Sequence, residues 1–214
     1  MTAEFDYPAP LRPEFFERQD EDDDARFYAE PRLVTHIDDE AIAALSRFYA
    51  TLIRPRSAVL DLMCSWISHL PAGLEFERVV GLGLNEAELA ENPMLDERIV
   101  QDLNRNPVLP FDDASFDAAV VTVSVQYLVR PVEVFAEVGR TLKPGAPFAV
   151  AYSNRMFPTK AVAIWRSLGH RERAELAGLY FRLSGRFGPP RAVDISPGPD
   201  SDPLVVVVAE VRPA

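Results

Sequence analysis

The side chains best suited to chemistry lie in one turn, residues 63–69, directly after an apolar run at 58–63. A short apolar run bounded by polar residues predicts a buried strand, and in an open parallel sheet ligands bind where such strands end. His69 is a candidate general base because an imidazole titrates near neutral pH; alternatively, it caps the segment that follows. Cys64 could be a nucleophile, but the role of a small hydrophobic residue is favoured because no matching Cys, His and Asn set is readable.

Polar residues also follow later apolar runs. Tyr127 comes after the run at 116–125, where it could contact a bound ligand or take a proton from it. A later loop carries Asn154, Arg155 and Lys160. Polar side chains in such a loop predict a substrate that bears a carboxylate or a phosphate, with surface charge and helix capping as the alternative.

Three further residues allow two interpretations each. His36 lies near Asp38 and is either a hydrogen-bonded anchor or a base. Trp66 and Trp165 either form walls of a pocket or belong to the core. No Cys and His spacing typical of a metal site is present in the sequence, so no metal is predicted.

The chain alternates between strand patterns and helix patterns. This alternation predicts an α/β domain with a parallel core. Two last apolar runs around the connection SPGPDSDP predict an antiparallel pair at the end of the sheet. Helices are expected at 40–53, 131–142, 159–168 and 171–183 and directly after Asn85, and strands at 58–63, 78–84, 97–103, 116–125, 147–153, 191–195 and 204–211.

The chain divides into an N-terminal arm or lid, residues 1–35, and one domain, residues 36–214. The arm has no sustained period, but its aromatic residues predict that it docks over the turn at 63–69 or the loop at 154–160. Its acidic run, residues 20–24, predicts a solvated segment without chemistry because contiguous carboxylates repel one another. The aromatic residues of the arm are Phe5, Tyr7, Phe15, Phe16, Phe27 and Tyr28.

Composition restricts the expected partners. The chain of 214 residues has 33 acidic and 22 basic residues and a net charge of −11, which disfavours nucleic acid as a partner. No apolar run approaches the roughly 20 residues that cross a bilayer, and no signal-peptide pattern opens the sequence. A single cysteine cannot form an internal disulfide, so a cytoplasmic location is expected. The expected partner is a small-molecule substrate, and the oligomeric state stays open.

Three motifs carry a family resemblance: VLDLMCS at 59–65, LPFDDASFDAAVV at 109–121 and EVGRTLKPGAPFAV at 137–150. With them the chain resembles class I S-adenosylmethionine-dependent methyltransferases with a type 11 methyltransferase domain. The resemblance implies a Rossmann-like, seven-stranded, mostly parallel sheet with a terminal antiparallel strand and helices on both faces. It also implies S-adenosylmethionine as the cofactor.

The resemblance assigns cofactor contacts residue by residue. Asp61 matches the acidic residue that orders the turn, and Met63, Ser65 and Ile67 stand where the family usually has glycines. Gly83 stands where the family places the carboxylate that binds the ribose, with Asn85 as a possible neutral substitute. The implied cofactor-binding residues are Asp61, Met63, Ser65, Leu84, Asn85, Asp102, Leu103, Asn104 and Ser124, with Asp102 near the adenine amino group.

Two functions therefore remain. The first is methyl transfer to a small molecule by in-line displacement, with His69 or Tyr127 as the base and Tyr127, Asn154, Arg155 and Lys160 around the acceptor. The second is a methyltransferase-like protein that binds a ligand or regulates a partner without transfer. The missing glycines of the turn and the absent ribose carboxylate motivate the second function.

Overall fold

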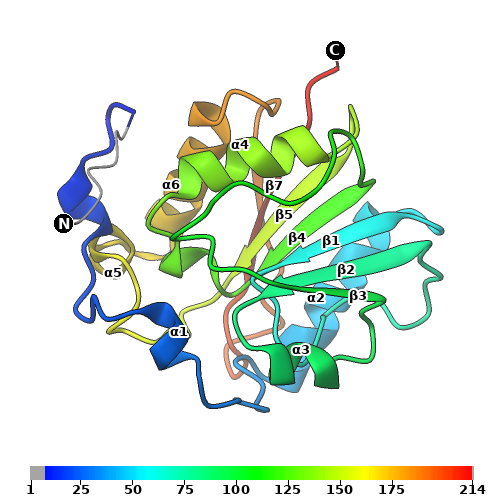
Figure 1. Cartoon of the computed structure of the whole chain (residues 1–214), viewed down its shortest axis with the longest axis horizontal. Coiled ribbons are helices and arrows are strands. Elements are labelled where there is room, and N and C mark those ends of the chain that lie inside the picture. The colour runs from blue at the N-terminus through cyan, green and yellow to red at the C-terminus, as the bar shows by residue number, and fades with distance from the viewer. Residues whose placement is uncertain (1–7, 214) are drawn as a thin grey trace.

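Residues 8–213 are described by the computed structural model, and they form a seven-stranded sheet with the order β3-β2-β1-β4-β5-β7-β6 (Figure 1). Strands β1 to β5 run parallel, whereas β7 is antiparallel to both of its neighbours. This confirms the expected fold class. The strands are β1 (Ala58–Leu62), β2 (Arg78–Gly83), β3 (Glu97–Val100), β4 (Ala118–Thr122), β5 (Pro147–Tyr152), β6 (Arg191–Asp194) and β7 (Val205–Glu210).

Helices cover both faces of the sheet because its central strands are apolar on both sides. Figure 1 shows α4 (Pro131–Thr141) and α6 (His170–Leu183) on one face, with α2 (Asp39–Leu52) and α3 (Glu86–Glu91) on the other. Each face has its own core. One is built around Phe135, Phe148, Phe181 and their neighbours, and the other around Leu45, Tyr49, Val79 and theirs.

Several expected elements are shorter than the sequence pattern predicts, among them β3, which ends at Val100 instead of residue 103. The strand expected at 116–125 ends at Thr122 because Val123 has a left-handed φ of 47°, and the short helix η2 (Val125–Tyr127) follows. The helix expected at 159–168 begins only at Ala163, as α5 (Ala163–Ser167). The residues before it turn beneath the N-terminal arm, and the backbone N–H of Asp20 in the arm donates to the carbonyl of Thr159 (2.9 Å).

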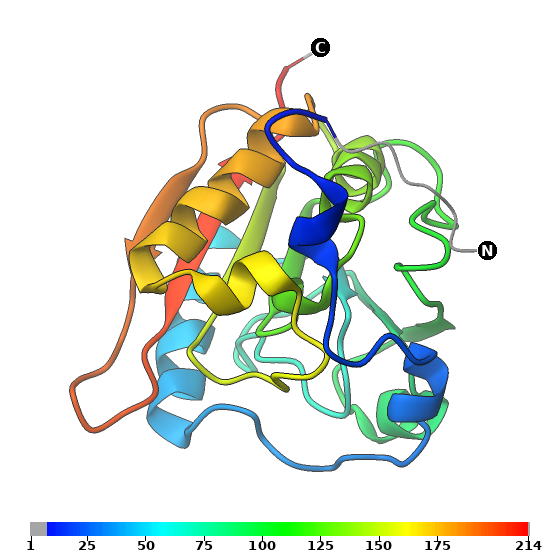
Figure 2. The same ribbon diagram turned by 90° about the vertical axis from the view of Figure 1, so that its left-hand side faces the viewer.

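The arm contains η1 (Pro13–Phe16) and α1 (Asp24–Phe27), and Figure 2 shows it passing beside α5 before it continues to α2. Leu11 and Phe16 are buried in the same core as α4 and α6, and the ring of Phe16 lies 6.4 Å from that of Tyr180. Two of its aromatic residues, Phe5 and Tyr7, lie outside the described residues. The arm is therefore packed against the domain over much of its length.

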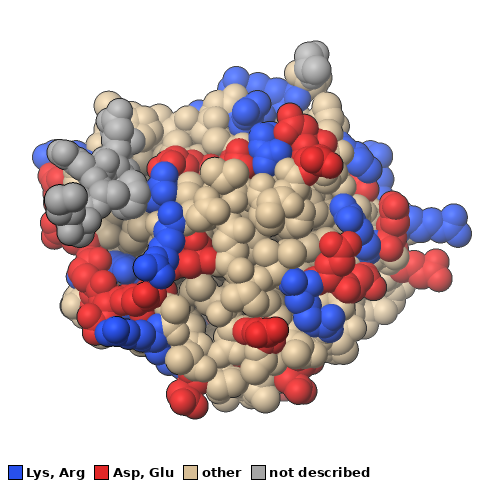
Figure 3. Space-filling model, in the orientation of Figure 1, with Lys and Arg blue, Asp and Glu red and all other residues tan. Residues whose placement is uncertain are grey.

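The acidic run of the arm differs from its expected role. Asp24 has an exposed fraction of only 5%, so the prediction of a fully solvated segment is wrong at this residue. Buried carboxylates persist where they are paired, and Asp24 has two cationic partners, described below. On the face shown in Figure 3, acidic and basic side chains are interspersed. Within residues 8–213, no helix has the length and apolar character to cross a membrane.

Candidate functional site

A cavity of about 430 Å³ opens where β1, β2 and β4 end, and the arm forms its outer wall. This volume falls in the range of small-molecule sites, and the position is the one that parallel sheets use for ligands. Its wall includes nearly every residue that the sequence assigned to ligand binding. These are Asp61, Met63, Ser65, His69, Leu84, Asn85, Asp102, Leu103, Asn104, Ser124, Tyr127, Asn154 and Arg155.

The turn after β1 keeps a conformation that favours glycine although it contains none. Met63 has a left-handed φ of 53°, which is uncommon outside glycine. The backbone N–H of Cys64 then donates to the carbonyl of Leu82 at 3.0 Å, so the turn rests on the end of β2. A Cβ atom at Gly83 would lie 2.3 Å from the carbonyl oxygen of Cys64. Only glycine therefore fits at the position where the family places its ribose carboxylate.

Asp61, in β1, contacts Ser68 near the end of this turn. Its carboxylate is buried and accepts a hydrogen bond from the hydroxyl of Ser68 at 2.6 Å. The amide of Asn92 donates to that hydroxyl at 3.0 Å and to the carbonyl of Ser65 at 2.9 Å. Burial raises the pKa of Asp61 to about 7. The carboxyl group is thus poised between its neutral and charged forms near neutral pH.

Glu88 is a cavity residue that sequence reasoning missed. It is 7% exposed, and its carboxylate accepts from the Ser65 hydroxyl at 2.5 Å and from the backbone N–H of Arg32 at 2.8 Å. Asn85 caps the helix below it, since its side-chain oxygen accepts from the N–H of Glu88 and its amide donates to the carbonyl of Tyr28. The signal in the sequence was an acidic residue in the first turn of a capped helix, which usually indicates only dipole stabilisation.

His69 lies in the cavity wall as a neutral imidazole. Its exposed fraction is 8%, and burial, with a smaller contribution from His36, lowers its pKa to about 4. The Nδ1 atom is buried and has no hydrogen-bond partner within the described part of the chain, and the same holds for the hydroxyl of Ser124. His36, directly after the arm, also lines the cavity, with its ring 5.4 Å from that of Phe157. His36, His69 and Ser124 are therefore candidate ligand-contacting residues of the wall.

The expected acceptor residues divide between the cavity and the arm. Tyr127 is in the wall, where its hydroxyl accepts from the N–H of Phe157 at 2.8 Å and burial raises its pKa. Asn154 and Arg155 are exposed at the rim, and Arg155 lies 3.5 Å from Asp202. Lys160 is absent from the cavity wall and is 0% exposed, so its predicted contact with an acceptor is wrong. Its ammonium is sealed beneath the arm among carboxylate and carbonyl oxygens.

Asp102 and Asn104 follow β3 and differ in the hydrogen-bonding groups that they leave for a ligand. Asp102 accepts from the N–H of Asn104 at 2.8 Å, and burial raises its pKa. The amide of Asn104 donates to Asp24 at 3.0 Å and to the carbonyl of Tyr127 at 2.9 Å, and its oxygen accepts from the N–H of Val129. Asn104 is therefore fully used within the protein, whereas the Asp102 carboxylate faces the cavity with remaining acceptor capacity.

The two tryptophans and Cys64 are the remaining candidate residues. Trp66 lines the cavity and donates to the carbonyl of Val34 at 3.0 Å, whereas Trp165 is 1% exposed in the core. Burial raises the pKa of the Cys64 thiol well above its usual value, which opposes a role as a thiolate nucleophile. Among residues 8–213, no cluster of three or more His, Cys, Asp or Glu residues could hold a metal ion.

Comparison with known proteins gives a domain match and a fold. The model of the methyltransferase domain family Methyltransf_11 matches residues 62–150. The structure of the [4+2]-cyclase SpnF is similar with a TM-score of 0.62 at 15% identity, covering 89% of this chain and 92% of that chain. A SAM-dependent methyltransferase from Aquifex aeolicus is similar with a TM-score of 0.59 at 17% identity, covering 80% of this chain and 91% of that chain. At these identities the structures show the shared fold.

A short segment also matches a curated protein. Over 43 residues the chain is 44% identical to the biotin biosynthesis bifunctional protein BioHC of Teredinibacter turnerae. The match covers 20% of this chain and 8% of that protein. The domain match, from the last residue of β1 into β5, and the seven-stranded sheet are the stronger findings. Together they show a methyltransferase domain match at residues 62–150 and a fold shared with S-adenosylmethionine-dependent methyltransferases.

Proposed function

We propose that this chain transfers the S-methyl group of S-adenosylmethionine to a neutral or cationic small molecule bound in the cavity. The observation that supports it best is the position of the cavity. It lies at the strand ends of the matched methyltransferase domain, and the arm covers it. An enclosed site suits methyl transfer, because the protein's task is to hold two reactants in attack geometry and exclude water.

The residues of the cavity fit the cofactor at three places. Asp102 offers a carboxylate acceptor for an adenine amino group. Asp61 orders the turn at 63–69 through its hydrogen bond from Ser68. No side chain fits at Gly83, so we assign the ribose hydroxyls to Glu88, whose two oxygens each keep a second lone pair. The bound cofactor supplies an electrophilic methyl group. The chain supplies the carboxylates that orient it.

The charges of the cavity argue for an acceptor without a negative charge. Four carboxylates line the wall, those of Asp24, Asp61, Glu88 and Asp102. The Arg32 guanidinium lies 4.6 Å over the ring of Phe27 and donates to its carbonyl through Nη2, whereas its Nη1 has no partner among the described residues. Asp24 is paired with two cations, and Asp61 is partly neutral near pH 7. Because Lys160 is sealed and Arg155 is at the exposed rim, a carboxylate or phosphate would meet Glu88 and Asp102 with mainly the Arg32 guanidinium to offset them.

The cavity also contains a group that can take a proton from the acceptor. The Nδ1 atom of neutral His69 has no partner among the described residues, and His69 lies in the same wall as Ser124 and Tyr127. We assign His69 as the proton acceptor for a hydroxyl or amine substrate. Tyr127, whose hydroxyl stays protonated because burial raises its pKa, positions the loop that carries Phe157.

The test is direct binding followed by a matched acceptor series. Isothermal titration should detect both S-adenosylmethionine and S-adenosylhomocysteine, and mass spectrometry under native conditions should show any retained cofactor. With the cofactor product bound, phenethylamine and 2-phenylethanol should bind more tightly than phenylacetate, which has the same carbon frame and a negative charge. Absence of heat with both cofactor forms would refute the function, and preference for phenylacetate would refute only the acceptor class.

A second function, ligand binding without transfer, is favoured by one specific feature. The turn that packs against Gly83 leaves no room there for the usual ribose carboxylate. A similar fold also occurs in SpnF, a [4+2]-cyclase, so the fold alone does not fix the reaction. Under this alternative the cavity binds its ligand tightly, but no S-adenosylhomocysteine forms from S-adenosylmethionine in the presence of a broad acceptor mixture. Product formation above a protein-free control excludes it.

A further inference from the structure

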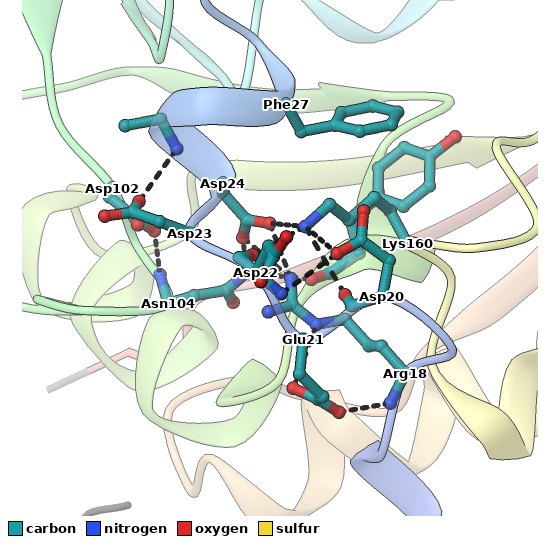
Figure 4. Close-up of polar contacts among 12 residues, drawn as sticks. Arg18, Asp20, Glu21, Asp22, Asp23, Asp24, Phe27, Asp102, Asn104 and Lys160 are labelled. Atoms are coloured by element: carbon teal, nitrogen blue, oxygen red, sulfur yellow. Dashed lines mark hydrogen bonds and ion pairs between the residues drawn. The ribbon is translucent and has the colours of Figure 1, made fainter.

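One buried carboxylate of the arm, that of Asp24, joins segments that are far apart in the sequence (Figure 4). It accepts from the Arg18 guanidinium at 2.7 and 2.8 Å and from the amide of Asn104 at 3.0 Å, and it pairs with the Lys160 ammonium at 3.1 Å. Its exposed fraction is 5%, and it also lines the cavity.

The segments that meet at Asp24 are those that the sequence assigned to ligands. Asn104 belongs to the predicted cofactor segment after β3, and its amide also holds the carbonyl of Tyr127, the predicted acceptor residue. Lys160 ends the predicted acceptor loop after β5 and donates to the carbonyls of Asp20 and Asp22. Both polar side chains thus contact the arm, and Asn104 does so from the cavity wall.

From this convergence we propose that Asp24 is the positioning residue that latches the arm over the cavity and so retains the bound ligand. The inference rests on the proposed function only for the identity of that ligand. Closing the latch fixes the wall that Tyr28, Arg32 and Val34 contribute from the arm. Opening it requires several buried charge contacts to break together.

The charge balance makes Asp24 the sensitive member of this group. Two cations, Arg18 and Lys160, share the carboxylate of Asp24. Arg18 also lies 3.6 Å from Glu21, and Lys160 lies 3.3 Å from Asp20 and 5.3 Å over the ring of Phe27. Removing the charge of Asp24 leaves Lys160 with the partly exposed Asp20 and Arg18 with the exposed Glu21 as their carboxylate partners. A buried cation that loses its buried partner is strongly unfavourable. Undocking of the arm returns those cations to water.

The experiment compares Asp24→Asn with Asp22→Asn in the full chain. Asp22 lies in the same segment and has an exposed side chain, so its substitution removes the same charge without touching the latch. Three quantities are measured: the rate of tryptic cleavage at the exposed Arg26 in the arm, the dissociation rate of S-adenosylhomocysteine, and hydrogen exchange of β1, β4 and β5. Each cleavage rate is taken with and without S-adenosylhomocysteine.

We expect Asp24→Asn to speed both cleavage and ligand dissociation at least tenfold, with slow exchange retained in the central strands. Asp22→Asn should match the wild type, and ligand should protect the arm of the wild type but not of Asp24→Asn. Faster exchange throughout the central strands would show a general structural role and overturn the proposal, as would a released arm with unchanged ligand dissociation.

A second variant covers two other results. If Asp24→Asn does not fold, Arg18→Gln removes the most peripheral cation of the latch and should give the same changes to a smaller degree. If the wild type binds no S-adenosylhomocysteine, the proposed cofactor fails. The latch is then tested by cleavage alone, and an arm of Asp24→Asn as resistant as that of the wild type overturns it.

Discussion

At the scale of single residues, Gly83 decides what the end of β2 can contain. An added Cβ would lie 2.3 Å from a backbone carbonyl, which cannot move aside as a flexible side chain can. Gly83→Ala should therefore lower the free energy of unfolding by about 1–3 kcal/mol, the usual cost of overpacking. Gly73→Ala is the control, because nothing lies within 4 Å of its added Cβ. Urea denaturation checks both variants, and equal midpoints would mean that the turn at 63–69 moves freely.

Glu88 is the residue on which recognition of the ribose depends under the proposed function. Wild-type protein should bind adenosine about tenfold more tightly than 2′,3′-dideoxyadenosine, a difference of about 1.4 kcal/mol. Glu88→Gln should lose this preference, because an amide offers one acceptor oxygen instead of two. Glu86→Gln, at an exposed position of the same helix, should keep it. If Glu88→Gln weakens both ligands equally, Glu88 only holds Ser65 and the arm in place.

Asp61 and His69 give opposite contributions to the pH dependence of stability. Burial raises the pKa of Asp61 from 3.8 to about 7, so between these values the folded chain keeps a proton that the unfolded chain has lost, and stability falls as pH rises. The pKa of His69 falls from 6.5 to about 4, so stability rises with pH over that window.

The two contributions should largely cancel up to about pH 6.5 in the wild type. Asp61→Asn removes one of them. Its free energy of unfolding relative to the wild type should therefore increase by about 1.4 kcal/mol for each pH unit within this window. Urea denaturation at about pH 4.5, 5.5 and 6.5 measures the difference. A difference independent of pH would show that Asp61 is already ionised in the folded chain.

At the scale of elements, Asp38 fixes the start of α2 and also holds the loop between β6 and β7. Its carboxylate accepts from the N–H of Ala41 at 2.8 Å, from the hydroxyl of Ser201 and from the N–H of Asp202. Asp38→Ala should lower the melting temperature more than Asp39→Ala, whose exposed side chain follows the cap.

The effect of Asp38→Ala should also depend on pH. The donors lower the pKa of Asp38, so its contribution is present above its unfolded-state pKa and is lost as the pH falls through the folded value. The difference in melting temperature between the variant and the wild type should shrink in acid. A difference that persists in acid would assign the effect to packing of α2 instead of the cap.

The elements with a local pattern could be predicted from the sequence, and the contacts between distant segments could not. The strands and most helices follow from apolar runs, and the cap at Asp38 follows from an acidic residue before a periodic segment. The latch has no such pattern, because Lys160 and Asp20 are 140 positions apart. A run of five acidic residues is usually solvated, so only the fold shows that Asp24 is buried.

The candidate site was predictable to the same extent. Position along the sheet places His69, Ser124 and Tyr127 at one edge, because the ends of parallel strands meet there. Whether a polar side chain faces the cavity or a neighbouring segment depends on tertiary packing. Asn104 and Lys160 therefore read as ligand contacts in the sequence, although both face Asp24.

At the scale of the whole molecule, the question is whether the arm and the domain unfold together. The two tryptophans report on the two parts separately. Trp66 donates to the carbonyl of Val34 in the arm at 3.0 Å, whereas Trp165 packs edge-on against Tyr152 in the core, with ring centroids 5.2 Å apart. Variants with one tryptophan each, Trp165→Phe and Trp66→Phe, therefore separate arm docking from core unfolding by fluorescence.

We expect Trp66 to change at a lower urea concentration than Trp165, because a segment held by a few buried charges and rings can open while the central strands stay paired. S-adenosylhomocysteine should move the Trp66 transition to higher urea, since a ligand under the arm stabilises the docked state by mass action. Asp24→Asn in the Trp165→Phe background should move it to lower urea and reduce the effect of the ligand. Coincident transitions for both tryptophans would mean that burial of Leu11 and Phe16 in the core makes arm and domain one cooperative unit, and the arm could then not open alone to admit a ligand.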